Sequence, residues 1–210
     1  MMCTEAEARA YVEGLGDASA LERLELLKAA LIEENERQNL VSRNSLDHIW
    51  LRHFADSAQL LEYVPREAFG PWLDMGSGAG FPGLVIAALR PQLPIILVES
   101  RKRRVEWLER MCSEMGLANC RVEGSRLELV DSFEAGVISA RAFAPLPKLI
   151  ALSARFSTAA THWVLPKGRS ATQEVTELST GLRKMFHVEQ SCTDAEAGII
   201  TGQGRAETRT

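Results

Sequence analysis

A glycine-rich turn that directly follows a short apolar run constrains the fold more than any other feature of the sequence. The stretch is Leu73-Asp74-Met75-Gly76-Ser77-Gly78-Ala79-Gly80-Phe81-Pro82-Gly83. Glycine lets backbone amides approach a ligand closely, and the start of a helix adds partial positive charge. Proline suits the first turn of such a helix, where a missing N–H costs nothing. The pattern therefore predicts a strand, a ligand-binding turn and a helix, in that order.

Short apolar runs alternate with amphipathic stretches from Pro71 onward, which is typical of βα units and a mostly parallel sheet. The expected strands are Trp72–Met75, Ile95–Glu99, Cys120–Glu123, Gly136–Ala140 and His162–Leu165. The expected helices are Pro82–Leu89, Lys102–Met115, Pro145–Phe156 and Ala171–Lys184. Two further runs, Phe186–Val188 and Ile199–Ile200, could supply a closing antiparallel pair. The predicted fold class is α/β and Rossmann-like, with helices on both faces of the sheet.

The first part of the chain is expected to be helical. Two helix-start signals, Thr4-x-x-Glu7 and Ser19-x-x-Glu22, each place a hydroxyl and a carboxylate where they can satisfy free backbone N–H groups. A further amphipathic helix is expected over Leu46–Leu61. We expect residues 1–66 to form an N-terminal helical cap on a core of residues 67–210, the two making one integrated domain.

Glu99 ends the second expected strand and so lies at the same sheet edge as the glycine turn. A carboxylate there can accept both hydroxyls of a ribose, in contacts worth roughly 1.5–3 kcal/mol. Asp74, at the end of the first strand, suits an ammonium group such as that of a methionine moiety. Together these residues indicate a pocket for a nucleoside ligand.

Three interpretations of the glycine turn remain open. Gly78-x-Gly80-x-x-Gly83 satisfies the dinucleotide fingerprint, which would indicate a nicotinamide or flavin site, and a structural turn without a ligand is another alternative. The register favours a methyl-donor site. A dinucleotide loop places its first glycine directly after the strand and its last glycine at the sixth position counted from the first. Here Gly76 directly follows the strand, but the sixth position is Phe81 and not glycine.

The residues after the other strands bear on the methyl acceptor. No Asn-Pro-Pro-Tyr stretch follows the fourth strand and no cysteine follows a proline, so an exocyclic amine or a pyrimidine ring carbon is a poor fit. N7 of guanine is already nucleophilic, and its lone pair can attack a sulfonium methyl without a general base. Arg141 and Lys167, after the fourth and fifth strands, could hold a phosphate or the guanine carbonyl, or could simply pair with surface carboxylates.

Composition bears on the location of the protein, on metal sites and on possible nucleic-acid partners. No apolar run approaches the length of a membrane span, so we expect a cytoplasmic protein that does not contact membranes. The four cysteines show no metal-ligand spacing, and we expect no metal site. The net charge of -4 argues against a generic nucleic-acid binder, so an RNA partner would have to meet a local basic face. The run Arg101–Arg104 is either part of such a face or an ordinary solvated helix start.

Through an ordered set of motifs the chain resembles the bacterial guanine-N7 methyltransferases of small-subunit ribosomal RNA, the glucose-inhibited division protein B family. Beside the glycine turn, the motifs are Asn39-Leu40, Arg52-His53-x-x-Asp56-Ser57, Glu99-Ser100, Ser125-Arg126, Ser139-x-Arg141-Ala142 and Lys167-Gly168. The resemblance implies a class I methyltransferase fold and transfer of a methyl group from S-adenosyl-L-methionine to a guanosine in the 530 loop of 16S rRNA. The acceptor would be the rRNA or the small ribosomal subunit, and we expect a monomer.

The resemblance and the turn together give a set of expected site residues. Cofactor-binding residues are Asp74, Gly76, Gly78, Gly80, Phe81, Glu99, Leu127, Glu128 and Arg141. Residues on the RNA side, or shaping the pocket, are Asn39, His53, Arg126 and Lys167, and the catalytic residues are Arg141 and Lys167. Periodicity alone instead makes His53 a hydrogen-bonded core histidine. On the residues alone, a methyltransferase acting on a small molecule or protein, and a nucleotide-binding oxidoreductase or noncatalytic module, also remain open.

Overall fold

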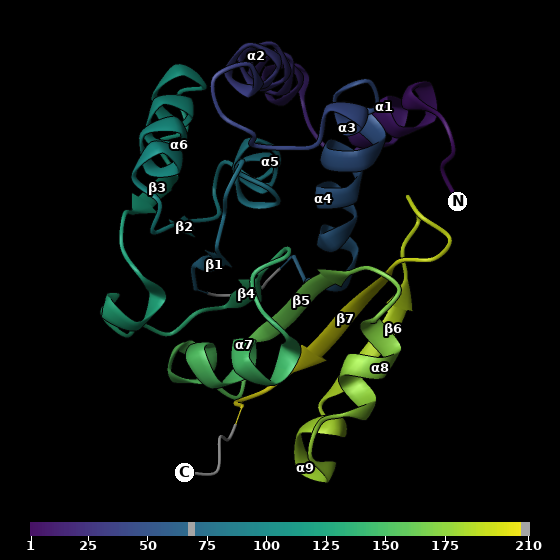
Figure 1. Ribbon diagram of the computed structural model, residues 1–210, viewed down its shortest axis with the longest axis vertical. Helices are drawn as coiled ribbons and strands as arrows, with labels where there is room; N and C mark the ends of the chain where they lie inside the picture. Colours follow the sequence, from purple (N-terminus) through teal and green to yellow (C-terminus); the bar gives the residue numbers. More distant parts are fainter. Residues whose placement is uncertain (67–69, 207–210) are drawn as a thin grey trace.

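A seven-stranded sheet forms the centre of the computed structural model, which describes residues 1–66 and 70–206 (Figure 1). Its strand order is β3-β2-β1-β4-β5-β7-β6. The strands are β1 (Trp72–Met75), β2 (Ile95–Val98), β3 (Cys120–Glu123), β4 (Val137–Ser139), β5 (His162–Lys167), β6 (Phe186–Gln190) and β7 (Gly198–Gln203). All neighbours from β3 to β5 pair in parallel, whereas β7 runs antiparallel to both β5 and β6. The predicted mostly parallel sheet and its closing antiparallel pair are confirmed.

The order of the strands reverses between β1 and β4. β1 pairs with β2 on one side and with β4 on the other. The chain therefore leaves the carboxyl ends of these two neighbouring strands in opposite directions, which opens a crevice at that edge of the sheet. The glycine turn follows β1, and the loop beginning at Arg141 follows β4, so both lie at this crevice.

The sheet lies between two hydrophobic cores. Alternate side chains of one strand enter different cores, so Trp72 of β1 lies in the first and Leu73 in the second. The first core is covered by α1 (Glu5–Glu13), α2 (Ala18–Asn35), α5 (Gly83–Leu89) and α6 (Lys102–Glu114). The second is covered by α7 (Leu146–Ser153), α8 (Ala171–Thr176) and α9 (Thr180–Arg183). Figure 1 shows the two helical layers above and below the sheet, as predicted.

The first helix begins as predicted and the second does not. Thr4 Oγ1 accepts the N–H of Glu7 at 3.2 Å, and the Glu7 carboxylate accepts the N–H of Thr4 at 3.1 Å, completing the capping box of α1. The predicted cap at Ser19 is wrong. α2 begins at Ala18 because the Asp17 carboxylate accepts the N–H of Ala20 at 2.8 Å. A carboxylate also interacts favourably with the positive end of the helix.

The single helix predicted over Leu46–Leu61 is wrong in detail. The chain forms α3 (Arg43–Leu46), the π-helical η1 (Trp50–Ala55), α4 (Asp56–Ala58) and the 3-10 helix η2 (Gln59–Tyr63). The Glu5 carboxylate of α1 accepts the N–H of Trp50 at 3.1 Å and of Leu51 at 2.8 Å. Backbone donors at the start of η1 thus find a partner on another element. The helix predicted over Ala171–Lys184 likewise divides into α8 and α9.

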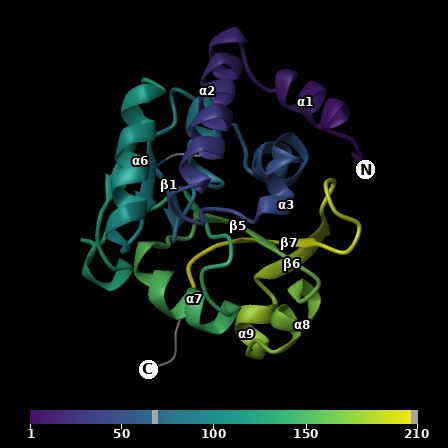
Figure 2. The same ribbon diagram turned by 45° about the horizontal axis from the view of Figure 1, so that its top comes forward.

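The N-terminal helices pack on the same core as the sheet. Leu24 and Leu31 of α2 lie in the first core with Val85 of α5, and Figure 2 shows α2 running across the molecule between α6 and α3. We therefore propose one integrated domain. The boundary expected at residue 67 falls outside the described residues, as do residues 207–210 of the expected core. Within the described ranges, no helix has both the length and the apolar character needed to cross a membrane.

Candidate active site

Two neighbouring cavities open at the carboxyl edge of the sheet. The smaller, of about 340 Å³, lies beside the glycine turn and the end of β2. The larger, of about 1000 Å³, lies beside η1 and the end of β5. Residues 142–144, which follow β4, line both cavities. This shared wall places any two ligands of the cavities side by side.

The glycine turn supports the wall directly. Gly76 has a φ of 67°, in the left-handed region that favours glycine. A Cβ at this position would lie 2.5 Å from Cδ2 of Phe143, so the Phe143 ring packs against the bare backbone of the turn. Only glycine satisfies both the backbone conformation and the close approach.

The Asp74 carboxylate closes the turn from inside the protein. Its Oδ1 accepts a hydrogen bond from Ser139 Oγ at 2.8 Å, and its Oδ2 accepts the N–H of Gly83 at 3.3 Å. Ser139 Oγ in turn accepts the indole N–H of Trp72 at 2.7 Å. Burial raises the pKa of Asp74 to about 6, although these hydrogen bonds oppose the shift. Asp74 is 0% exposed, so its expected contact with an ammonium group remains a proposal.

Glu99 presents a carboxylate that backbone N–H groups hold in place. Its Oε1 accepts the N–H of Ser100 at 2.7 Å and of Arg101 at 2.8 Å, and its Oε2 accepts the N–H of Gly78 at 3.1 Å. The guanidinium of Arg104 lies 3.9 Å from Oε2. A carboxylate oriented in this way is a strong acceptor for hydroxyl groups.

Four of the nine expected cofactor-binding residues line the smaller cavity. They are Gly76, Glu99, Leu127 and Glu128. The turn residues Gly78, Gly80 and Phe81 are buried and do not belong to the lining. Arg126, expected on the RNA side, is exposed and lies on this cavity, with Arg101 and Lys148.

A hydrogen-bonded chain follows one wall of the larger cavity. Arg141 Nη1 donates to His53 Nδ1 at 3.1 Å, so Nδ1 is an acceptor. The ring proton must then sit on Nε2, which donates to Ser45 Oγ at 2.9 Å. Ser45 Oγ donates to the carbonyl of Ser42 at 2.7 Å. These contacts assign one neutral tautomer to His53.

The surroundings of His53 keep it uncharged. Its ring stacks on Phe81 with centroids 4.8 Å apart and planes 8° from parallel. Burial, then the positive charges of Arg141 and Arg52, lower the pKa of His53 to about 3. His53 is 6% exposed and hydrogen-bonded, as the periodicity argument predicts, and it also lines the larger cavity.

Arg141 is held at one corner of its guanidinium. Nη1 lies 3.7 Å from Asp56 Oδ2, and the guanidinium carbon lies 5.0 Å from the centroid of the Phe81 ring. Asp56 also accepts a hydrogen bond from Thr193 Oγ1 at 2.8 Å. The hydrogen bonds and the ion pair that described residues make with this guanidinium all use Nη1. Nη2 and Nε make no hydrogen bond or ion pair with the described residues.

Lys167 also lines the larger cavity. Its Nζ donates to Glu174 Oε2 at 2.9 Å and to the carbonyl of Ala144 at 3.0 Å. The carboxylate pairing considered from the sequence is therefore present, and a third N–H remains for a ligand. Asn39 is exposed and precedes Leu40 and Val41, which line the same cavity.

Several residues that line the larger cavity were missed by sequence reasoning. Ser45, Phe143 and Glu174 were not identified, and Asp56 was quoted within a motif without a role. Phe143 lies two residues after the cation Arg141, and it packs against Gly76 in the structure. A bulky aromatic residue so close to a strand-end cation was the signal in the sequence that could have identified it. For Ser45 and Glu174 no local signal exists, because their partners come from other elements of the fold.

The two cavities suit a reaction between two bound molecules that needs no proton abstraction. The smaller offers a fixed carboxylate to a nucleoside, and the larger offers cations to an anionic or carbonyl-bearing partner. The carboxylates that line the larger cavity are all paired with cations: Asp56 with Arg141, Glu174 with Lys167 and Asp194 with Arg52. This pairing favours chemistry that depends on holding the partners in line.

Known proteins similar to this chain share one description. A family model described as rRNA small subunit methyltransferase G matches residues 20–199. A protein named ribosomal RNA small subunit methyltransferase G from Erythrobacter litoralis is 62% identical over 208 residues, covering 99% of this chain and 100% of the relative. The protein of the same name from Novosphingobium aromaticivorans is 52% identical, covering 96% of this chain and 89% of the relative.

A solved structure shares the architecture. It is an RNA methyltransferase from Salinibacter ruber in complex with S-adenosyl-L-homocysteine, with a TM-score of 0.55 and 15% identity over 73% of this chain and 92% of that one. At this identity the similarity shows the fold alone, a Rossmann-like methyltransferase fold.

Proposed function

Because the chain belongs to the rRNA small subunit methyltransferase G family, we propose that it methylates N7 of a guanosine in the 530 loop of 16S rRNA. The family makes the chain an S-adenosylmethionine-dependent rRNA methyltransferase, and the choice of atom and loop is the proposed part. The observation that carries the proposal is the pair of adjoining cavities, one with the fixed Glu99 carboxylate and one with the cations Arg141 and Lys167.

The smaller cavity fits S-adenosylmethionine. Glu99 is held by three backbone N–H groups and lines a cavity of about 340 Å³. It would accept the ribose hydroxyls, while Leu127 and Glu128 would contact the adenosine and Gly76 would let the methionine part pass close to the backbone. When bound, the cofactor supplies an electrophilic methyl group on its sulfonium.

The larger cavity favours an acceptor that brings no proton to be removed. Both ring nitrogens of His53 are occupied, and the lowered pKa of His53 keeps the ring neutral. Guanine N7 has a free lone pair, so orientation supplies the catalysis, to the extent of about 7–11 kcal/mol in well-aligned systems. The free edge of Arg141 would hold the guanine O6 or a phosphate, and Lys167 would meet a phosphate.

The same proposal includes the substrate, the location of the enzyme, its oligomeric state and its metal requirement. The substrate is 16S rRNA or the small ribosomal subunit, which places the enzyme in the cytoplasm. A monomer suffices, because the residues of both cavities come from one chain. No metal ion is required, since the nucleophile needs no activation.

Methyl transfer to small subunits tests the proposal. Subunits from a strain that lacks the modification are incubated with the enzyme and radiolabelled S-adenosylmethionine, and the labelled base is mapped. We expect one labelled guanosine in the 530 loop, with the label on N7. Label at another RNA position would overturn the assigned nucleotide, and label on ribosomal protein alone would overturn the acceptor class.

A further inference from the structure

The Glu174 carboxylate of α8 connects three elements around the active site. Its Oε2 accepts hydrogen bonds from Lys167 Nζ at 2.9 Å and from the N–H of Leu146 at 2.8 Å. Its Oε1 accepts from Ser170 Oγ at 2.8 Å. The side chains of Lys167 and Glu174 are only 10% and 17% exposed, so solvent screens this ion pair much less than a surface pair. The carboxylate therefore ties the end of β5 and the start of α7 to α8.

The same ion pair holds the wall between the two cavities. Lys167 Nζ also donates to the carbonyl of Ala144 at 3.0 Å, so the loop after β4 is fixed at Ala144 and again at Leu146. This loop includes Ala142, whose φ of 52° is unfavourable for a residue with a Cβ. A conformation of this kind persists only where the surroundings hold it.

We propose that Glu174 is a positioning residue for methyl transfer, acting through Lys167 and through the wall formed by residues 142–144. The proposal rests on the proposed function, because the wall matters only if donor and acceptor occupy the two cavities. Phe143 packs on Gly76 on one side and lines the larger cavity on the other. A shift of the loop changes the angle between the ligands, and a misplacement of about 1 Å can cost about 100-fold in rate.

Steady-state kinetics of Glu174→Gln test this role. The amide oxygen can still accept the Leu146 N–H, so the substitution removes mainly the charge that orients Lys167. We expect kcat for methyl transfer to unmodified small subunits to fall at least 10-fold, with a much smaller change in KM for the subunit. The matched control is Glu177→Gln, which alters an exposed carboxylate at the end of the same helix and should keep the wild-type kcat. A Glu174→Gln enzyme that loses thermal stability but keeps its kcat would show a merely structural role.

A double-mutant cycle with Lys167→Met tests whether Glu174 affects kcat through Lys167. If Glu174 acts through Lys167, then Glu174→Gln should reduce kcat by less than twofold once Lys167 is already replaced. Losses that simply multiply would show that the two residues act independently and would overturn the proposed route.

Hydrogen exchange tests the connection to the loop without any enzymatic activity. In Glu174→Ala the amide of Leu146 loses its acceptor, so we expect its exchange, and that of residues 142–144, to become at least 10-fold faster. Glu177→Gln should exchange like the wild type. Unchanged exchange in Glu174→Ala would overturn the positioning role whatever the activity. A wild-type enzyme that transfers no methyl group would instead overturn the proposed function, with the exchange result still deciding whether Glu174 holds the loop.

Discussion

His53 lies where a charged imidazole would be costly. One face stacks on Phe81, and the two ring nitrogens contact Arg141 and Ser45. Because the guanidinium has no acceptor atoms, the ring can satisfy it only in its neutral form. The hydrogen bonds therefore select the same protonation state as burial does. A residue that sequence periodicity assigns to the core is thus fixed in charge and tautomer by contacts from the loop after β4 and from α3.

This fixed protonation state predicts a pH dependence of stability. The pKa of His53 is about 3 in the folded protein, against 6.5 for an unperturbed histidine. Between those values the unfolded chain binds a proton that the folded chain does not, so the stability from neutral His53 is present above pH 6.5 and is lost as the pH falls towards 3. The amide of His53→Gln can replace both hydrogen bonds. Between about pH 7.5 and pH 5, the free energy of unfolding of this variant should fall by about 1–2 kcal/mol less than that of the wild type.

Urea unfolding at the two pH values measures the effect. His187→Gln, at an exposed position on β6, is the control and should keep the wild-type pH dependence. Identical pH dependence in His53→Gln and in the wild type would contradict the assignment of a neutral, buried ring.

Glu99 leads to a second prediction about a single side chain. Its charge-assisted contacts with the ribose hydroxyls are worth roughly 1.5–3 kcal/mol, so Glu99→Ala should weaken S-adenosylhomocysteine binding roughly 10- to 100-fold. Titration calorimetry measures the change. Glu109→Ala, at an exposed position on α6, should bind as the wild type does. Equal affinity in Glu99→Ala and the wild type would remove the ribose contact from the proposed pocket.

At the scale of the element, the sequence predicts what depends on neighbours in the chain. The capping box of Thr4 and Glu7 is local, and the prediction was right. The start of α2 was placed wrongly because two acceptors, Asp17 and Ser19, compete within one turn, and the carboxylate is the one used. η1 could not be predicted, since the Glu5 carboxylate that accepts its first N–H groups is 45 and 46 residues away in the chain.

The same distinction applies to the candidate site. Turn glycines and strand-end charges carry local signals, so Gly76, Glu99 and Arg141, which line the two cavities, could be selected as candidates from the sequence. Glu174 is joined to Leu146 across 28 positions, and Ser45 contacts His53 only because α3 folds back on η1. Such partners become visible only when the topology is known.

The geometry of the glycine turn predicts that a single methyl group added at Gly76 destabilises the protein. Gly76→Ala would place a Cβ 2.5 Å from Phe143 Cδ2 and force alanine to a φ of 67°. We expect a loss of about 1–3 kcal/mol in the free energy of unfolding, together with weaker cofactor binding. Gly181→Ala on α9 is the control, because no atom lies within 4 Å of the added Cβ and alanine favours a helix, so this variant should not lose stability. Unfolding by urea, with and without S-adenosylhomocysteine, gives both quantities. Equal stabilities of the two variants would show that Phe143 does not pack on the turn.

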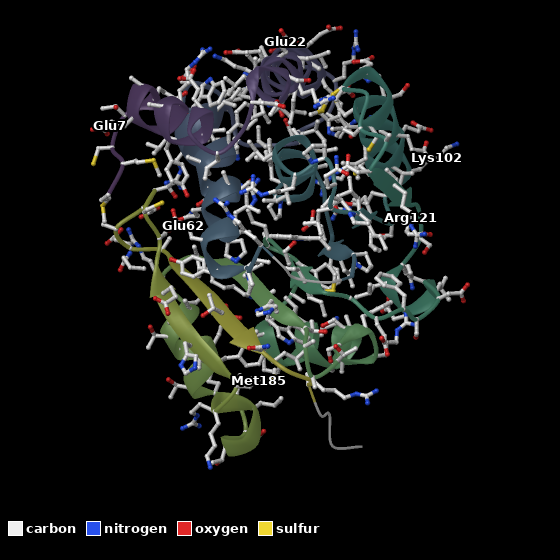
Figure 3. All side chains as sticks on the ribbon, turned by 180° about the vertical axis from the view of Figure 1, so that it is seen from behind. Glu7, Glu22, Glu62, Lys102, Arg121 and Met185 are labelled. Atoms are coloured by element: carbon white, nitrogen blue, oxygen red, sulfur yellow. The ribbon has the colours of Figure 1, made fainter. Side chains whose placement is uncertain are left out.

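At the scale of the whole molecule, the positions of the charged residues say more about contact with RNA than the net charge does. The chain carries a net charge of -4, yet α6 begins with the cationic run Arg101–Arg104 and has no acidic residue in its first turn. Cations oppose the dipole at the start of a helix and slightly destabilise it. This helix start follows β2, so it lies at the same edge of the sheet as the two cavities. Figure 3 shows Lys102 on the outer side of α6, where its side chain is 91% exposed.

The charge at the start of α6 predicts how methyl transfer depends on salt. Lys102 and Arg103 are exposed and line neither cavity of the active site, so replacing both with alanine should leave cofactor affinity unchanged. If both contact phosphates of the RNA, log(kcat/KM) for the small subunit should fall less steeply with log salt, by a slope of about 1.4–1.8. The control is Arg183→Ala with Lys184→Ala at the end of α9, on the opposite helical layer, which should keep the wild-type slope (Figure 1). If the α6 variant also keeps the wild-type slope, these cations do not meet the RNA. The acidic enzyme would then have to bind its substrate through the cations that line the cavities themselves.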